Sequence, residues 1–206
     1  MKWDNIFILS FNQNNGLLKS HEDIVTITSD AMIMRYFIKH QNCYSLNRVT
    51  RIQDADILGE YYDIYKDCMK TDGELTKLVV VGHYETFNKL FTPYRFAELI
   101  RFCGAQSVTY ISFKVCSLGE TDYLYKLRDY LPGVHLFSGY KGSITPDYFC
   151  KNKKIKYSIR LTDNVAERVL HKISGEKLPD VFRRTVIFGH SYNPAFFLGT
   201  KYYRGH

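Results

Sequence analysis

The sequence predicts an α/β protein whose central sheet is mostly parallel and whose C-terminal part is antiparallel and basic. From Leu78 to Phe137, apolar runs typical of buried strands alternate with amphipathic helical patterns, as they do in parallel βαβ units. With 45% hydrophobic and 24% charged residues among 206, the chain has the composition of a folded globular domain. Beyond Gly139 the pattern changes, because Gly142 and Pro146 interrupt it and basic residues become frequent.

The first third of the chain is expected to hold two strands and two helices. Residues 5–11 form an apolar run that ends at an Asn-rich turn, and residues 24–28 alternate like a short strand. Ser29 or Asp30 can cap a helix that continues to about residue 40. A second helical pattern covers residues 54–70.

The middle of the chain gives the clearest pattern. Residues 78–82 form a Val-rich strand, and Thr92-Pro93 is a strong helix start, because Thr caps well and Pro fits the first helical turn. A strand at 108–115, a helix at 122–131 and a strand at 134–138 follow. We therefore predict consecutive parallel strands over this region.

The last third is expected to be a cationic flap region on the α/β core of a single domain, with the core at 1–140 and the flap region at 141–206. We predict a basic hairpin strand at 151–161, a helix at 165–173, and strands at 185–189 and 196–203. Residues 141–206 carry 13 Lys and Arg against 5 Asp and Glu, whereas residues 1–140 carry 15 against 16. This asymmetry favours an anionic partner, and a merely solvated surface is the alternative.

Several classes of protein are disfavoured by the sequence. The five cysteines are odd in number and widely spaced. This spacing argues against a disulfide framework and against a zinc site, and it favours a reducing compartment. No apolar run approaches the ~18 residues that span a membrane, and no cleavable signal peptide is recognisable. We expect no metal and no membrane segment.

His83 and Cys116 are the strongest candidates for chemistry. Each follows the end of a predicted strand, and one helix separates the two strands. Catalytic groups collect at the carboxyl ends of parallel strands, and a thiol beside an imidazole is the minimum for thiolate catalysis. The turn Ser117-Leu118-Gly119 is expected to supply N–H donors for an oxyanion.

Val80-Val81-Gly82-His83, followed after one helix by Val115-Cys116-Ser117-Leu118-Gly119, resembles the self-cleaving cysteine protease domain of MARTX toxins and large glucosylating toxins. That family belongs to the caspase-like clan. The resemblance covers roughly residues 5–204 and is specific only from 78 to 143. It implies a caspase-like three-layer sandwich with a C-terminal basic antiparallel flap. It also implies that Cys116 is the nucleophile and His83 its base, in an endopeptidase that cleaves usually after Leu.

The resemblance further implies allosteric activation by inositol hexakisphosphate, which binds a basic pocket under the flap. Clustered Lys and Arg side chains are the usual ligands of phosphates. The candidate phosphate-binding residues are Lys151, Lys153, Lys154, Lys156, Arg160, Arg183 and Arg184, with Arg48 and Arg51 as further candidates from before the His. In some relatives an Asp orients the His, and Asp30 or Asp23 could serve here.

Some type III secreted effectors are stand-alone proteins of this kind. The resemblance thus implies a virulence effector, made in the bacterial cytoplasm and secreted without a cleavable signal peptide. It would cleave host proteins in the host cytosol.

Three alternatives stay open. Tyr84 stands where the family has a Gly, which favours a catalytically weak or inactive protease-like protein that binds a polyphosphate or nucleic acid. The basic run 151–156, flanked by aromatic residues, matches only a generic nucleic-acid pattern. The same dyad also suits another acyl transfer, such as deamidation.

Overall fold

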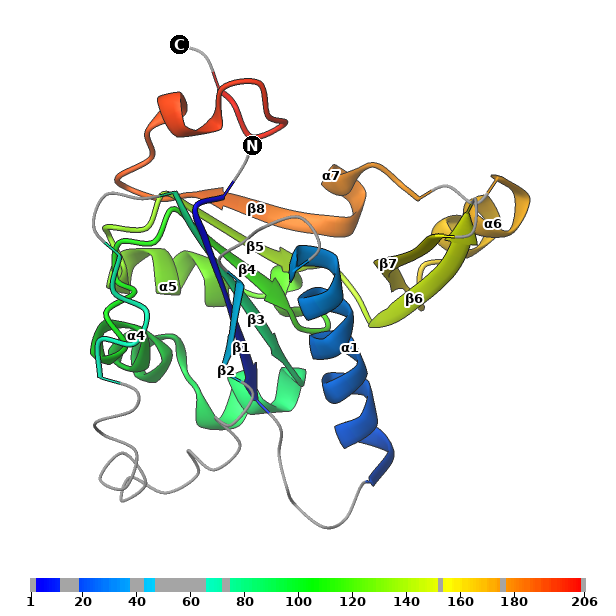
Figure 1. The fold of residues 1–206 in the computed structure, drawn as a ribbon, viewed down its shortest axis with the longest axis horizontal. Coiled ribbons are helices and arrows are strands. Elements are labelled where there is room, and N and C mark those ends of the chain that lie inside the picture. Colours follow the sequence, from blue (N-terminus) through cyan, green and yellow to red (C-terminus); the bar gives the residue numbers. More distant parts are fainter. Residues whose placement is uncertain are drawn as a thin grey trace.

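The central element of the fold is a six-stranded sheet, and a separate two-stranded hairpin lies to one side of it (Figure 1). The computed structural model describes residues 3–11, 19–37, 43–46, 66–71, 75–151, 154–174 and 177–204. The strand order in the large sheet is β2-β1-β3-β4-β5-β8, and only β8 runs antiparallel to its neighbour. The strands are β1 (Asn5–Phe11), β2 (Cys43–Leu46), β3 (Thr76–Gly82), β4 (Tyr110–Lys114), β5 (Leu136–Tyr140) and β8 (Arg184–Phe188). The predicted α/β class with a mostly parallel sheet is confirmed.

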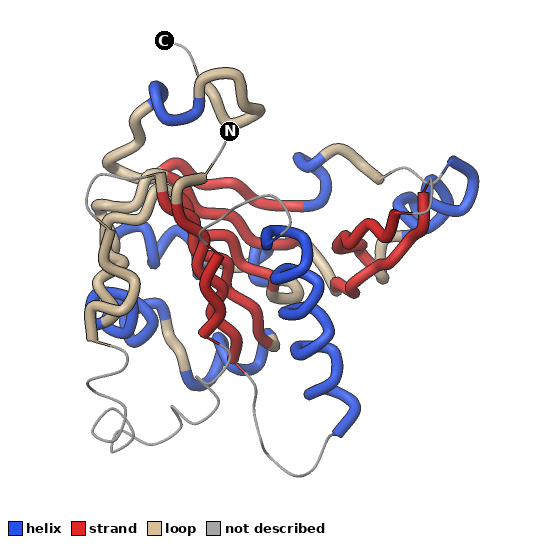
Figure 2. Tube along the Cα trace, in the orientation of Figure 1, coloured by secondary structure: helices blue, strands red, loops and turns tan. Residues whose placement is uncertain are grey.

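Helices cover both faces of this sheet (Figure 2). On one face lies α1 (Lys19–Phe37), whose Met32 packs with Ile8 and Val79. On the other face lie α4 (Pro93–Phe102) and α5 (Tyr123–Tyr130), which bury Phe96 and Leu124 against the sheet. Side chains alternate along a strand, so the residues of β3 contribute to two separate cores, one on each face of the sheet. Val79 belongs to the core on the α1 face, and Val80 belongs to the core on the α4 and α5 face.

The flap region begins with the hairpin β6 (Ile144–Lys151) and β7 (Lys154–Leu161). Helix α6 (Val165–Ser174) and the short helix α7 (Asp180–Arg183) follow. The chain then returns to the core, where β8 pairs with β5. The hairpin, α6 and α7 project to one side of the large sheet (Figure 1). The segment 141–206 is therefore partly flap and partly an integral strand of the core.

Most predicted elements in the second half of the chain are confirmed within a few residues. Thr92 caps α4 by accepting a hydrogen bond from the Arg95 N–H, as its position before Pro93 predicts. The predicted helix at 54–70 lies mostly outside the described residues, and 66–69 form a turn.

Two predicted strands are wrong. Residues 24–28 belong to α1, because Val25, Thr28 and Met32 are buried at helical spacing. Residues 196–203 form turns and part of a 3-10 helix, Pro194–Phe197. Asn193 caps that helix by accepting from the Ala195 N–H. A Pro after a capping Asn favours a helical turn over a strand, which the apolar run concealed.

Candidate active site and basic cavity

The sheet brings His83 and Cys116 to the same carboxyl edge. Strands β3 and β4 are parallel neighbours, and Val81 pairs with Lys114. His83 and Cys116 each lie two residues beyond that pair, so the two candidates end adjacent strands. Both side chains are half-buried. The predicted placement of both residues past strand ends is confirmed.

The Cys116 thiol faces the start of the flap hairpin. Its Sγ accepts a hydrogen bond from the Ile144 N–H at 3.3 Å and lies 4.0 Å from the Ile144 carbonyl oxygen. Burial raises the pKa of the thiol, and the nearby Asp163 carboxylate raises it further, whereas the Ile144 bond lowers it. The net direction is upward, so the thiol is protonated at neutral pH in this state. A nucleophile in this position needs further activation.

The loop after Cys116 is tightly fixed to the core. Ser117 has a left-handed φ of +53°, which confirms the predicted sharp turn. Its N–H donates to the Gly142 carbonyl at 2.9 Å, so the prediction that this turn offers oxyanion donors is wrong for Ser117. A Cβ on Gly119 would lie 2.3 Å from the Gly139 carbonyl oxygen, and Thr185 donates to the Gly119 carbonyl. Only glycine fits at position 119.

The other residues that the sequence analysis connected with the active site are Asp30, Asp23 and Tyr84. Asp30 is exposed on α1, and the neighbouring Ser29 is hydrogen-bonded to Ser10 on β1 at 2.6 Å. The Asp23 side chain lies outside the described residues. Tyr84, half-buried, packs against the core on the α4 and α5 face.

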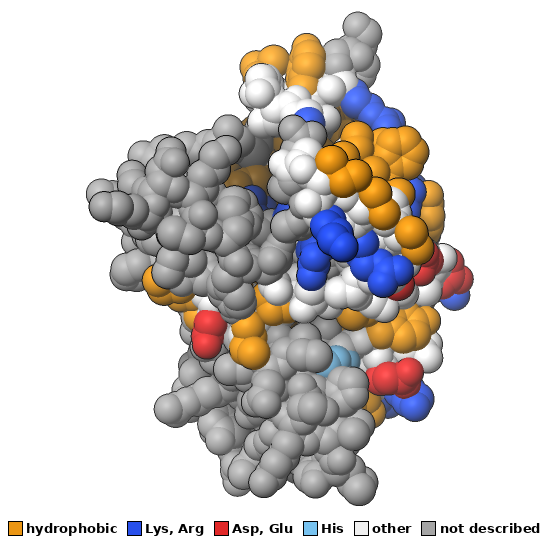
Figure 3. Space-filling model, turned by 90° about the vertical axis from the view of Figure 1, so that its right-hand side faces the viewer, with side chains coloured by type: hydrophobic (Ala, Val, Ile, Leu, Met, Phe, Trp, Pro, Cys, Tyr) orange, Lys and Arg blue, Asp and Glu red, His pale blue; other side chains and the backbone are white. Residues whose placement is uncertain are grey.

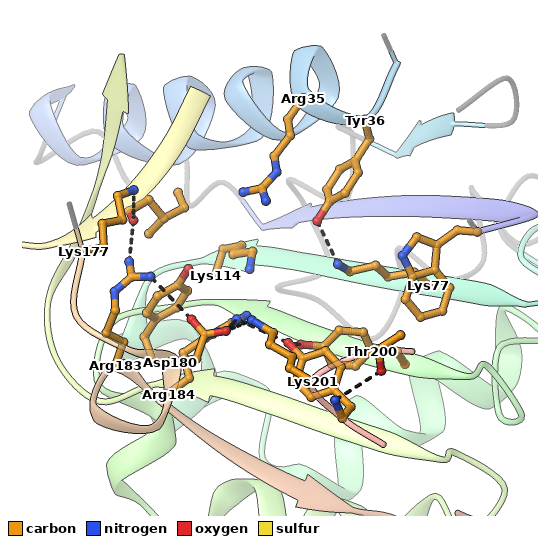
Figure 4. A pocket seen from close by; sticks show the side chains of 15 residues that line it. Arg35, Tyr36, Lys77, Lys114, Lys177, Asp180, Arg183, Arg184, Thr200 and Lys201 are labelled. Atoms are coloured by element: carbon orange, nitrogen blue, oxygen red, sulfur yellow. Dashed lines mark hydrogen bonds and ion pairs between the residues drawn. The ribbon is translucent and has the colours of Figure 1, made fainter. Parts of the chain in front are cut away.

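A deep basic cavity lies on the α1 side of the sheet, with a volume of about 410 Å³ (Figure 4). Seven Lys and Arg residues line it against one acidic residue, Asp180. These cations come from α1, β3, β4, the segment before α7, α7, β8 and the C-terminal turns. They are Arg35, Lys77, Lys114, Lys177, Arg183, Arg184 and Lys201; Trp3, Tyr36, Tyr110, Tyr140, Ile159, Thr200 and Tyr202 complete the lining.

Two lysines on the sheet form the floor of the cavity. Lys77 and Lys114 are 9% and 5% exposed and lie on β3 and β4. The Lys77 ammonium donates to the Tyr36 hydroxyl at 2.8 Å and lies 4.9 Å from the centre of the Tyr110 ring. Lys114 donates to Ser112 at 3.1 Å. Hydroxyls and aromatic faces, rather than carboxylates, thus surround both ammonium groups.

The cavity carries more positive charge than the acidic side chain in its lining can neutralise. Burial lowers the pKa of Lys114, and repulsion by Arg184 and Lys77 lowers it further. Burial alone would raise the pKa of Tyr110. The charges of Arg184 and Lys77, together with hydrogen bonds to Ser138 and Tyr202, lower that pKa to about 8. Depressed lysine and tyrosine pKa values side by side indicate a site that gains stability from an added anion. The cavity therefore favours an anionic ligand over a neutral or cationic one.

The sequence identified part of this cavity. Of the predicted phosphate-binding residues, Arg183 and Arg184 line it, and Arg160 does not. The side chains of Lys151, Lys154 and Lys156, and the whole of Lys153, Arg48 and Arg51, lie outside the described residues. The sequence analysis missed Arg35, Lys77, Lys114, Lys177 and Lys201. A usable signal was present, because a lysine inside a buried strand, as at 77 and 114, is rare without a functional partner.

The flap hairpin joins the cavity to Cys116. At the cavity, Arg183 and Lys177 both donate to the Ile159 carbonyl of β7, at 2.6 and 2.9 Å. Two residues further along β7, Leu161 pairs with Ile144 of β6. Ile144 is the residue that hydrogen-bonds the Cys116 thiol. One two-stranded element therefore contacts both the cavity and the Cys116 thiol.

The side of the molecule that carries the hairpin, α6 and α7 is rich in Lys and Arg side chains, which lie next to exposed hydrophobic ones (Figure 3). Within the described ranges, no group of three or more His, Cys, Asp or Glu residues is placed to hold a metal ion. None of the helices described is both long and apolar enough to cross a membrane.

Comparison with protein-family models, curated proteins and solved structures gave no match.

Proposed function

We propose that this chain is a caspase-like cysteine endopeptidase, switched on by inositol hexakisphosphate, and that it acts on host proteins as a secreted effector. The observation that carries the proposal is the hairpin β6–β7, which contacts the basic cavity at Ile159 and the Cys116 thiol at Ile144. The order of strands around a His and a Cys at neighbouring strand ends supports the same family. Secretion and a host substrate rest on the family resemblance.

In the proposed reaction, the Cys116 sulfur attacks the carbonyl carbon of the scissile peptide bond. His83 takes the thiol proton and later gives a proton to the leaving amine, and water then hydrolyses the acyl-enzyme. The Tyr84 N–H, at the position after the His, is the proposed oxyanion donor, because the Ser117 N–H is engaged by Gly142. Any residue except proline can offer this N–H.

The switch follows from the charge of the cavity. A polyanion would be held by Lys77, Lys114 and Arg184 from the sheet and by Arg183 and Lys177 next to the hairpin. Filling the cavity would redirect the two cations that now bond the Ile159 carbonyl. Such a shift would alter the hairpin and hence the contact between Ile144 and the thiol. Without the anion the thiol keeps its raised pKa.

Labelling of Cys116 tests the enzyme directly. A peptide acyloxymethyl ketone ending in Leu is expected to alkylate Cys116 about tenfold faster or more with inositol hexakisphosphate, because activation converts the thiol to the reactive thiolate. Mass spectrometry of tryptic peptides gives the rate at each cysteine. Cys68 and Cys103 provide internal controls, since Cys103 follows the end of α4 and Cys68 lies in the turn 66–69 next to it.

Two variants complete that experiment. His83→Ala should lose the acceleration while still binding the ligand, and Cys116→Ala should lose the label and any cleavage of proteins in a host-cell lysate. A labelling rate at Cys116 that the ligand leaves unchanged would contradict the peptidase proposal.

Binding of inositol hexakisphosphate is also expected to weaken as pH rises from about 7 to about 9. Tyr110, with a pKa of about 8, becomes an anion in that range and repels the ligand. Lys114 has lost its charge above its lowered pKa and must regain a proton in the complex. Both effects have the same sign, so binding takes up protons.

Calorimetry in buffers of different ionisation heat measures this uptake. The double variant Tyr110→Phe, Lys114→Met reports the titration of the ligand alone. Wild-type protein that takes up no more protons than this variant would contradict the assignment.

A second candidate function is a polyphosphate-binding protein without peptidase activity. It is favoured by the raised thiol pKa and by Tyr84, which packs on the core where the family has a glycine. Ligand binding without ligand-dependent labelling of Cys116 would identify this case.

A further inference from the structure

Asp180 is the single acidic residue among the residues that line the described cavity. It is the first residue of α7, and its side chain is 23% exposed. Its carboxylate forms ion pairs with Arg184 and Lys201, and a longer one of 3.6 Å with Arg183. Figure 4 shows the carboxylate directed toward the cations of the cavity, where dashed lines mark these pairs. One carboxylate therefore engages three of the seven cations.

Asp180 is not needed to hold these arginines in place. Arg183 is already paired with the buried Glu167 at 2.8 Å and bonded to the Ile159 carbonyl. Arg184 lies over the Tyr140 ring and reaches the Tyr202 hydroxyl at 3.3 Å. The carboxylate adds charge compensation to side chains that other groups already position. Its location is the one that an anionic ligand would occupy.

We propose that Asp180 is a built-in counter-ion that an incoming polyphosphate must displace. The inference rests on the proposed function, because it takes the cavity to be the polyphosphate site. In the ligand-free protein Asp180 neutralises part of a cluster of like charges and so stabilises the empty cavity. In the complex it opposes the ligand, because two anions compete for Arg184 and Lys201.

The competition sets which anions can bind. A single small anion offers these cations little more than the carboxylate already gives them. An anion with several phosphates also reaches Lys77 and Lys114 on the sheet, which Asp180 does not engage. Asp180 thus favours dense polyphosphates over inorganic phosphate. It acts as a specificity-determining residue of the site.

The variant Asp180→Asn tests this role. It keeps the shape of the side chain and removes its charge. The dissociation constant for inositol hexakisphosphate, measured by calorimetry, is expected to fall about tenfold or more, since like-charge contacts oppose binding strongly. The melting temperature of the ligand-free variant should fall, whereas that of the complex should not. The temperature shift caused by the ligand should therefore grow.

Asp129→Asn is the matched control, because it makes the same change in net charge at an exposed ion pair on α5, with His190, away from the cavity. Its affinity for the ligand should equal that of the wild type. If Asp180 instead positions the cations, Asp180→Asn will bind the ligand more weakly, and the inference is overturned.

The outcomes separate the two proposals. Wild-type binding with an equal or weaker Asp180→Asn variant overturns the role of Asp180 and leaves the proposed function standing. Failure of the wild type to bind inositol hexakisphosphate overturns both, whatever the variant does. Inorganic phosphate at equal phosphorus concentration is the second probe, and it should bind the wild type much more weakly than the polyphosphate.

Discussion

Lys114→Met is expected to weaken binding of inositol hexakisphosphate about 100-fold, because loss of one buried partner of a charge pair costs about 2–5 kcal/mol. Lys114 is 5% exposed on the cavity floor, and methionine keeps most of its unbranched apolar stem while removing the ammonium group. The same variant should stabilise the ligand-free protein, because burial and repulsion by Arg184 and Lys77 both destabilise the ammonium group in the folded state. Binding and stability therefore change in opposite directions.

The sign of the stability change follows from the lowered pKa of Lys114. A lysine whose pKa falls on folding destabilises the folded state, most at low pH and least as pH approaches its unfolded value. The gain on replacement should thus be larger in mildly acidic than in alkaline solution. Lys126→Met, at an exposed pair with Asp122, is the control and should change neither quantity. A Lys114→Met protein that is less stable at low pH would contradict the cavity electrostatics.

Glu167→Ala is expected to cost about 3–5 kcal/mol of unfolding free energy, the usual effect of removing one partner from a buried ion pair. Glu167 is fully buried on α6 and is 2.8 Å from the Arg183 guanidinium. Its second oxygen accepts the Leu161 N–H at 3.0 Å. The variant leaves both donors without their acceptor. Urea unfolding, followed by the fluorescence of the single tryptophan Trp3, measures the loss.

Two further variants decide how that loss arises. Glu167→Gln keeps an acceptor for Leu161 and should lose clearly less stability than Glu167→Ala. Glu85→Ala, at an exposed pair with Lys89, should change stability by less than about 1 kcal/mol. Inositol hexakisphosphate should rescue Glu167→Ala in part, because it supplies negative charge near Arg183. Equal losses for the alanine and glutamine variants would show that charge alone matters.

The predictable part of the fold is the part in which local pattern and burial agree. The strand at 78–82 is an unbroken apolar run and is buried throughout, and the helix after Thr92 buries the face that its helical spacing predicts. The strand predicted at 24–28 was wrong because a short polar-apolar alternation also fits one side of a helix. In the structure these residues belong to α1, whose apolar side chains are buried against β1 and β3. Tertiary packing decided between the two.

The site divides in the same way. The placement of His83 and Cys116 past neighbouring strand ends could be predicted, because the ends of apolar runs are visible in the sequence. The cavity was predicted only as a charge excess after residue 140, which led to Arg183 and Arg184 and away from Lys77 and Lys114. Those lysines precede residue 140, where the net charge is near zero. The pairing of β3 with β4 places both lysines in the lining of one cavity, which the sequence alone does not show.

Gly119 fixes the loop that follows Cys116 to the core of the protein. The backbone there lies so close to the Gly139 carbonyl that no Cβ fits, and Thr185 holds the Gly119 carbonyl from β8. The loop after Cys116 is thus anchored to two core strands, whereas the described strands β6 and β7 pair only with each other. The loop cannot shift unless β5 shifts with it. Any movement that separates the Cys116 thiol from Ile144 and leaves the sheet intact must therefore come from the hairpin.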